Sequence, residues 1–161
     1  MGSKLKLRRA VCEDADALTQ LAKSAKASWG YPAEWLQAWE AQLSFSARYL
    51  REHDVFVAEL SGKPVGVVAV DEADEPEIAH LWVSPRSQRQ GVGRALMKHV
   101  EAFGREQGWT SIRIESDPHA RPFYERLGAV YEGEVPAPVA GTARTLPLLR
   151  LSLAKRPARA R

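Results

Sequence analysis

The sequence predicts a domain of mixed α/β (α+β) class, in which a central mixed sheet of about seven strands carries helices on both faces. Three observations lead to this prediction. Short apolar runs typical of strands alternate with longer stretches whose apolar residues recur at helical spacing. The length of 161 residues fits one domain. Neither an internal repeat nor a low-complexity linker divides the sequence, so we expect a single domain over residues 4–153.

The first half of the chain is expected to form a strand, two helical segments and a hairpin. Alternation in KLKLRRA indicates the strand, and Asp14 is a suitable cap for a helix with an apolar stripe that includes Leu18 and Leu21. Two apolar runs joined by Ser61 and Gly62 indicate the hairpin. The expected ranges are 4–10 for the strand, 33–51 for a second helical region interrupted near Ser44, and 55–60 and 63–70 for the hairpin.

The second half is expected to contain a central strand, two helices and three further strands. EIAHLWV is apolar on nearly both faces, as in a buried strand. Leu96, Val100 and Phe103 form one stripe of a helix that Gly108 ends, and Pro122 suits the first turn of a shorter helix. The expected ranges are 77–83, 110–116, 129–134 and 146–153 for strands, and 93–107 and 122–128 for helices.

The distribution of charge argues against nucleic acid as a partner. The formal net charge is +3, but four of the 23 Lys and Arg residues lie in the final KRPARAR, and the remaining 19 face 20 acidic residues. We therefore expect a nearly neutral domain, a basic disordered tail over residues 154–161, and no nucleic-acid partner. Nucleic-acid binding through that tail is the alternative.

Cysteine content and hydropathy bear on compartment, metal and membrane. Cys12 is the single cysteine, so an internal disulfide is impossible and we expect a cytoplasmic protein. One cysteine gives no metal-ligand spacing, and we expect no metal. No apolar run approaches the roughly 20 residues of a membrane span, and the first residues lack the apolar core of a signal peptide. We expect no membrane partner.

The most informative stretch is SPRSQRQGVGRALM, which runs from Ser84 to Met97. It places Gly91 and Gly93 at the expected start of a helix and surrounds them with three arginines. The first N–H groups of a helix have no internal partner and lie at the positive end of its dipole, so they attract phosphate. The stretch therefore predicts a phosphate-binding loop. It lacks the Lys of nucleoside-triphosphate loops and the third Gly of the dinucleotide fingerprint, which excludes both.

Three motifs of the chain together resemble one family. They are Gln88-Arg89-Gln90-Gly91-Val92-Gly93, which has the form Q-x-x-G-x-G, and Leu81-Trp82-Val83-Ser84-Pro85, which has the form L-x-V-x-P. The third consists of Asp117, Ala120, Phe123, Tyr124, Gly128 and Ala129, spaced as in N-x-x-A-x-x-F-Y-x-x-x-G-[FA] but with Asp in the Asn place. Taken in their order along the chain, they resemble the GNAT superfamily, the acyl-CoA-dependent N-acetyltransferases.

The resemblance implies a sheet splayed between its fourth and fifth strands, with acetyl-CoA as co-substrate. The pantetheine arm is then expected in the gap, paired with the backbone of Leu81, Trp82 and Val83, where an N–H polarises the acetyl carbonyl. Main-chain N–H groups of the glycine loop would bind the pyrophosphate. The residues implied are Arg89, Gln90, Gly91, Val92, Gly93 and Arg94.

Tyr124 is implied as the general acid that protonates the leaving thiolate. For the base that takes the proton of the amine, Glu77 is the first choice, and His80 and Glu115 are rivals. Because an amine is far more basic than a carboxylate, Glu77 needs a raised pKa or must act through water.

Asp117 departs from the Asn of the family motif. An ionised carboxylate can only accept hydrogen bonds, whereas Asn can also donate one to a pantetheine carbonyl. Asp117 remains a candidate contact of the cofactor. The alternative is that it caps the short helix near Pro122, with His119 taking the polar contact.

The acceptor pocket is expected between the first two helices and the loop before the last strand. The aromatic residues gathered there are Trp29, Tyr31, Trp35 and Trp39, most of them as packing residues and some as lining of the site. Arg144 is expected in a surface salt bridge, with contact to an acidic group of the substrate as the alternative.

The function expected from the resemblance is transfer of an acetyl group from acetyl-CoA to a primary amine, by direct attack in a ternary complex. The amine belongs to a small molecule, an amino acid or a peptide. A non-catalytic acyl-CoA sensor is the alternative, and a homodimer is a further expectation.

Overall fold

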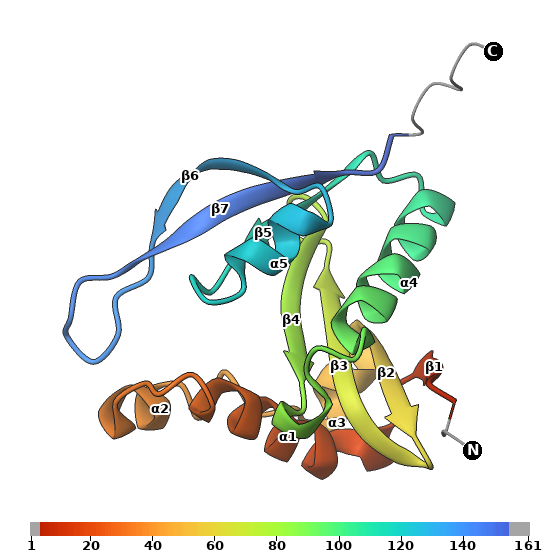
Figure 1. The fold of residues 1–161 in the computed structure, drawn as a ribbon, viewed down its shortest axis with the longest axis horizontal. Helices are drawn as coiled ribbons and strands as arrows, with labels where there is room; N and C mark the ends of the chain where they lie inside the picture. Colours follow the sequence, from red (N-terminus) through yellow and green to blue (C-terminus); the bar gives the residue numbers. More distant parts are fainter. Residues whose placement is uncertain (1–3, 155–161) are drawn as a thin grey trace.

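A computed structural model describes residues 4–154, and their seven strands form one sheet in the order β1-β2-β3-β4-β5-β7-β6 (Figure 1). The strands are β1 (Lys6–Arg9), β2 (Asp54–Leu60), β3 (Lys63–Asp71), β4 (Glu77–Val83), β5 (Ser111–Glu115), β6 (Val130–Pro136) and β7 (Thr145–Ser152). The α-helices are α1 (Ala15–Ala27), α2 (Ala33–Ala38), α3 (Ala47–Glu52), α4 (Val92–Glu106) and α5 (Arg121–Arg126). The predicted mixed class is confirmed.

The sheet is antiparallel except between β4 and β5. These two strands run parallel and pair at one position, Glu77 with Arg113. From there β5 continues along β7 and not along β4, so the two strands diverge. In Figure 1, β5 lies with β6 and β7 in one half of the sheet, and β4 lies with β1 to β3 in the other. The predicted splay between the fourth and fifth strands is therefore confirmed.

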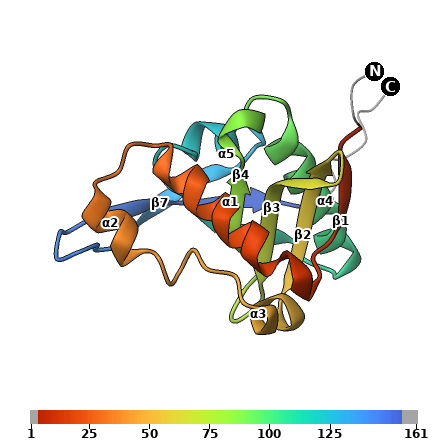
Figure 2. The ribbon, with the colours of Figure 1, turned by 90° about the horizontal axis from the view of Figure 1, so that it is seen from below.

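Helices cover both faces of the sheet, as predicted (Figure 2). Successive side chains of a strand point to opposite faces, and β3 shows this directly. Val68 and Val70 belong to the core beneath α4 and α5, whereas Val67 and Ala69 belong to the core beneath α1 and the segment that follows it. The valine-rich sequence of β3 thus reflects burial on both sides.

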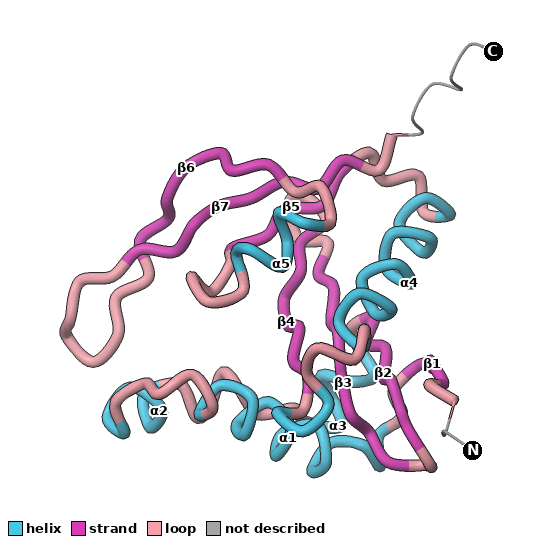
Figure 3. Tube along the Cα trace, in the orientation of Figure 1, coloured by secondary structure: helices cyan, strands magenta, loops and turns pink. Residues whose placement is uncertain are grey.

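The second helical region is interrupted, as the sequence suggested near Ser44. α2 ends at Ala38 and α3 begins at Ala47, with a loop between them (Figure 3). Ser46 caps α3, because its Oγ accepts the backbone N–H of Tyr49. The loop carries buried Leu43 and Phe45, so its apolar residues serve the core without a continuous helix.

Asp14 precedes α1, but the prediction that its side chain caps the helix is wrong. Its two carboxylate oxygens accept hydrogen bonds from the two terminal nitrogens of Arg8, at 2.8 and 2.9 Å. One oxygen also accepts the Val11 N–H at 2.8 Å. A bidentate guanidinium is a stronger partner than a helix N–H, and the pair ties β1 to the start of α1.

Residues 155–161, which make up nearly all of the expected basic tail over 154–161, lie outside the described residues. Within residues 4–154, none of the helices has both the length and the apolar character needed to cross a bilayer.

Candidate active site

The start of α4 has the backbone form of an anion site. Arg89 and Gly91 both adopt left-handed φ angles, of 63° and 81°, and Gly91 is the residue that precedes the helix. Left-handed residues between right-handed or extended ones turn neighbouring N–H groups toward a common point. The 15-residue helix adds the positive end of its dipole. The glycine loop therefore has the donors and the field that a phosphate requires.

Gly93 serves a different purpose from Gly91. A Cβ atom at position 93 would lie 3.2 Å from the ring of Phe123 and 3.6 Å from Cγ2 of Val83. Without a side chain, α4 approaches both α5 and the end of β4. Gly91 provides the backbone direction, and Gly93 provides the close packing.

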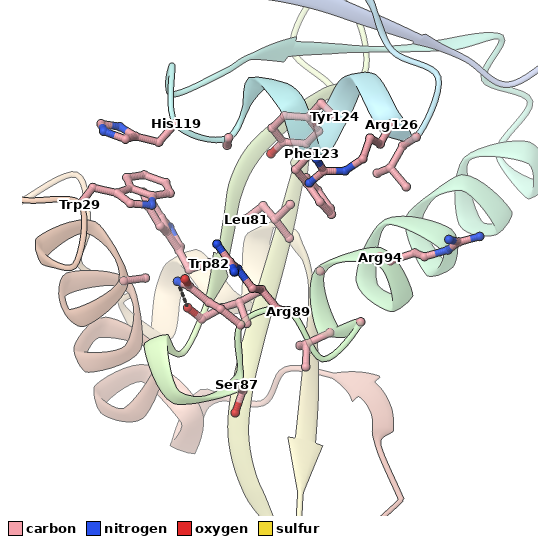
Figure 4. A pocket seen from close by; sticks show the side chains of 18 residues that line it. Trp29, Leu81, Trp82, Ser87, Arg89, Arg94, His119, Phe123, Tyr124 and Arg126 are labelled. Carbon is pink, nitrogen blue, oxygen red and sulfur yellow. Dashed lines mark hydrogen bonds between the residues drawn. The ribbon is translucent and has the colours of Figure 1, made fainter.

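A cavity of 480 Å³ opens between the start of α4, the end of β4 and α5 (Figure 4). It brings together most of the residues predicted to bind the cofactor, and the predicted acid: Leu81, Trp82, Val83, Arg89, Gly91, Val92, Gly93, Arg94, His119 and Tyr124. The glycine loop, the end of β4 and the predicted acid Tyr124 therefore border the same cavity.

Seven lining residues were given no site role from the sequence: Ala25, Ser87, Gln88, Ala120, Phe123, Arg126 and Leu127. Arg126 is the most informative of them, since Figure 4 shows its side chain beside Phe123 and Tyr124. It follows Phe123 by three positions, which places the two on one face of a helix. That spacing was a usable signal, but the direction of the face depends on how α5 packs.

Four residues predicted for the site do not line the cavity: Gln90, Asp117, Glu77 and His80. Gln90 folds back, and its Nε2 donates to the carbonyl of Arg86 at 3.4 Å. Glu115, the third candidate base, is also outside the lining. Glu77 sits at the first residue of β4, where that strand pairs with β5. The predicted acid and bases therefore do not share one wall.

Tyr124 is buried, with 5% of its surface exposed, and its ring packs on the edge of Phe123. Burial, together with the nearby charge of Asp117, raises the pKa of Tyr124. The phenol therefore keeps its proton at neutral pH. Among residues 4–154 its hydroxyl has no hydrogen-bond partner, so it is available to a ligand in the cavity.

Glu77 has the electrostatic character of a proton acceptor. Burial, and then the neighbouring carboxylate of Glu115, raise the pKa of Glu77 to about 7, while Arg113 opposes the shift. Arg113 is itself engaged with Glu75 and Glu115. A carboxyl group that titrates near neutral pH exchanges protons readily under physiological conditions.

His80 has the character of a packing residue. Its ring lies 4.8 Å from that of Phe45, and its Nδ1 accepts the indole N–H of Trp82 at 3.0 Å. Burial, and then the proximity of His53, lower the pKa of His80 to about 4. The imidazole is neutral at pH 7 and its Nδ1 lone pair is occupied, which argues against His80 as the base.

Asp117 is the centre of a buried cluster at one end of the cavity. Its Oδ2 accepts hydrogen bonds from Lys26 Nζ at 3.0 Å, Tyr31 Oη at 2.7 Å and Arg144 Nη2 at 3.4 Å. Its Oδ1 accepts from the backbone N–H of His119 at 2.9 Å and lies 2.9 Å from His119 Nδ1. We call these five residues the acceptor-end cluster. The idea that Asp117 caps α5 is wrong, since that helix begins at Arg121, its N-cap residue is Ala120, and no side chain caps it.

Burial would raise the pKa of Asp117, but the charge of Lys26 and the hydrogen bonds from Tyr31, His119 and Lys26 outweigh it and lower the pKa. Burial lowers the pKa of Lys26, against the attraction of Asp117. Asp117 is therefore a fixed anion between two buried cations. The prediction that Arg144 forms a surface salt bridge is wrong in one respect: the pair is buried, with 11% of the Arg144 side chain exposed.

Four aromatic rings lie around the Lys26 ammonium, those of Trp29, Tyr31, Trp39 and Trp82. The Lys26 ammonium lies 4.0 Å from the ring centroid of Trp39 and 5.7 Å from that of Trp29. Trp29 in turn stacks on His119, with centroids 5.3 Å apart and planes 9° apart. Trp29 and His119 both line the cavity, and His119 belongs to the cluster, so this stack marks where the cavity meets the cluster.

Sequence comparison gives the family and a relative. The family described as "Acetyltransferase (GNAT) family" matches residues 16–129. A curated relative, N-acetyltransferase family 8 member 2 of Rattus norvegicus, is 38% identical over 90 residues, which are 51% of this chain and 39% of the relative. The chain thus spans well under half the length of that relative.

Solved structures share the fold. A GCN5-related N-acetyltransferase from Rhodopseudomonas palustris has a TM-score of 0.80 at 22% identity, covering 94% of this chain and 98% of that one. The PaiA N-acetyltransferase from Thermoplasma acidophilum, in complex with coenzyme A, has a TM-score of 0.73 at 14% identity, covering 92% and 99%. The family match runs from α1 to the end of α5 and includes the glycine loop. The chain therefore belongs to the acetyltransferase (GNAT) family.

Proposed function

We propose that the chain is an acyl-CoA-dependent N-acetyltransferase, which transfers the acetyl group of acetyl-CoA to a primary amine of a small molecule, amino acid or peptide. The observation that carries the proposal is that the glycine loop, the diverging edge of β4 and Tyr124 border one cavity. Family membership supports acetyl transfer, and the coenzyme A complex of the Thermoplasma relative supports the ligand.

Acetyl-CoA fits the cavity in one direction. Its pyrophosphate belongs at the N–H groups from Arg89 to Arg94, where the left-handed loop and the helix dipole favour an anion. Its pantetheine arm belongs along β4, because within the described residues β5 pairs with β4 at Glu77 alone and leaves that edge open. His119 is a better polar contact for the arm than Asp117, whose oxygens are already occupied.

The chemistry is direct attack in a ternary complex. The amine nitrogen attacks the thioester carbon, the C–S bond breaks, and the Tyr124 hydroxyl gives its proton to the thiolate. The nitrogen then loses its second proton through water to the Tyr124 phenolate, which restores the acid. Glu77 takes the proton of the incoming ammonium through water, since it lies outside the cavity lining. With a pKa of about 7, Glu77 lies roughly 3 units below an ordinary alkylamine. The free-energy cost of moving the proton from the ammonium to Glu77 is therefore about half of that for an unperturbed carboxylate.

The proposal is tested by thiol release from acetyl-CoA across a panel of amines, amino acids and peptides. Calorimetry with CoA is run on the same samples. We expect turnover with at least one acceptor, and loss of most of it in Tyr124→Phe with CoA affinity retained. CoA binding without turnover on any acceptor would identify a sensor and reject the enzyme. Absence of CoA binding would reject both.

A further inference from the structure

The acceptor must reach the thioester from the end of the cavity that acetyl-CoA leaves free. One end is the glycine loop, where the pyrophosphate is proposed to bind. The other end is the stacked pair of Trp29 and His119, which Figure 4 shows on the side away from Arg94. Directly behind that pair lies the acceptor-end cluster, since Tyr31 Oη is 3.2 Å from His119 Nδ1 and 2.9 Å from Arg144 Nη2. An acceptor entering here passes next to this cluster.

Aromatic rings pack near the guanidinium of Arg144, and some of its N–H groups remain without a partner. Its guanidinium carbon lies 5.3, 5.8 and 5.1 Å from the ring centroids of Tyr31, Trp35 and Trp39. Such stacking fixes the plane of a guanidinium without using its N–H groups. The hydrogen bonds of the side chain within the described residues come from Nη2, so Nε and Nη1 have no partner there. Both edges of a guanidinium that offer two parallel N–H groups include Nη2, which here already donates to Tyr31 and Asp117. The unpartnered Nη1 therefore offers a carboxylate one charge-assisted hydrogen bond.

The charges around Arg144 also favour an anion. Lys26 and Asp117 form the shorter ion pair, at 3.0 Å, and leave Arg144 with the longer contact of 3.4 Å. Two cations therefore share one carboxylate, and arginine does not lose its proton. Trp39 is buried, but the half-buried ring of Trp35, which packs on it, offers apolar surface to the rest of an acceptor.

We propose that Arg144 recognises a carboxylate on the acceptor, so that the preferred substrates are amino acids with a free carboxylate and an apolar side chain. The proposal rests on the proposed acetyl transfer and names the substrate class of the same site. It assigns Arg144 to specificity, with Asp117 and the aromatic rings as positioning residues. Carboxylate-free amines, diamines above all, are poor acceptors because they bring a positive charge to a cationic cluster.

The test compares each acceptor with its amide, in wild type and in Arg144→Gln. The pairs are L-phenylalanine with L-phenylalaninamide and L-leucine with L-leucinamide, and kcat/KM is measured for each. Amines in an acid and its amide differ in basicity, but that difference cancels when the acid-to-amide ratio is compared between the two proteins. We expect the ratio to fall about tenfold or more in Arg144→Gln, as for loss of a hydrogen bond between charged groups.

The variants are chosen to separate recognition from stability. In Arg144→Gln, Lys26 still pairs with Asp117, so no buried carboxylate is left alone. Arg144→Lys keeps the charge but loses the planar guanidinium that stacks on the rings, and should restore the ratio only in part. Arg121→Gln is the matched control, because Arg121 also stacks on a ring, that of Tyr131 at 4.3 Å, but pairs with Glu125 on α5. It should leave the ratio unchanged.

A binding measurement without CoA provides a second readout. Tryptophan fluorescence is titrated with N-acetyl-L-phenylalanine and with its amide, since Trp35 and Trp39 both lie beside the guanidinium. We expect a saturable change with the acid in wild type that disappears in Arg144→Gln. The inference is overturned if the ratio is the same in wild type and Arg144→Gln, if Arg121→Gln lowers it equally, or if cadaverine is the better acceptor. If no acceptor is acetylated while the acid still binds through Arg144, the proposed acetyl transfer is rejected and the carboxylate site is supported. If neither acetylation nor binding is seen, both proposals are rejected.

Discussion

Replacement of Gly91 by alanine isolates the role of the glycine loop, because the chain offers a matched control. Gly91 and Gly62 have nearly the same left-handed φ, 81° and 78°, and a Cβ at either position would have no atom within 4 Å. An alanine therefore meets the same backbone strain at both sites. Gly62 lies in the turn between β2 and β3, whereas Gly91 opens α4.

The expected magnitudes follow from that equality. Alanine in the left-handed region costs about 1–2 kcal/mol, and the reduced freedom of the unfolded chain offsets about 0.4–1 kcal/mol of it. Both variants should thus lose about 1 kcal/mol of unfolding free energy. In Gly91→Ala the strain also falls on the left-handed residue that turns the N–H groups at the start of α4, so we expect the phosphate to lose a donor. Loss of one charge-assisted hydrogen bond there costs about 1.5–3 kcal/mol, or about 10- to 150-fold in the Kd for CoA.

Urea denaturation measures the stability of the two variants, and calorimetric titration with CoA measures affinity. We expect equal losses of stability and a weaker Kd in Gly91→Ala alone. If both variants bind CoA as tightly as wild type, the loop does not hold the pyrophosphate and the reasoning from the backbone geometry is refuted. If both bind more weakly by the same factor, the loss reflects general destabilisation.

Four further predictions concern three titrating groups, Glu77, Tyr124 and Asp117. The acetylation rate should rise with pH through about 7, because only the carboxylate form of Glu77 accepts a proton, and this limb should disappear in Glu77→Gln. Because the pKa of Glu77 is raised in the folded protein, its contribution to stability is present below pH 4.5 and is lost as the pH rises to about 7. Glu77→Gln should therefore show a higher urea midpoint than wild type above pH 7, and no such difference at pH 4. Tyr124→Phe should lower kcat about 100-fold with stability and the Kd for CoA nearly unchanged, since its hydroxyl has no partner among the described residues; an unchanged kcat would remove Tyr124 from the chemistry. Asp117→Asn should lose about 3–5 kcal/mol in urea denaturation because two buried cations lose their anion, and Lys26→Met in that background should recover part of it; a neutral effect would show that the cluster is not an ion-pair centre.

The elements that border the cofactor end of the site could be predicted from the sequence. The stripe of Leu96 and Val100 sets the face of α4, and the apolar character of residues 77–83 predicts β4 as a strand. The expectation that this strand is buried is wrong, since Ile78 is its only buried residue. Both signals are local, because periodicity and glycine placement act over a few residues. The phosphate loop between them was predictable for the same reason: two glycines and a helix start are neighbours in the chain.

The acceptor end could not be predicted in this way. Lys26 and Asp117 are 91 residues apart, and Arg144 joins them from the loop before β7. The sequence could identify the unusual Asp117 and the gathering of aromatic residues, but not that the carboxylate binds Lys26. The partners of a buried charge depend on which elements the fold brings together. The local sequence around each residue does not indicate those partners.

The sequence by itself determined the order of the elements, the phosphate loop and the family, because these depend on local periodicity and on contiguous motifs. Tertiary structure alone decided that Arg126 faces the cavity, that Glu77 and His80 lie outside its lining, and that Asp117 sits between Lys26 and Arg144. The physical reason is that burial and ion pairing arise between segments distant in the chain. A side chain's pKa, partners and exposure are therefore properties of the packed molecule.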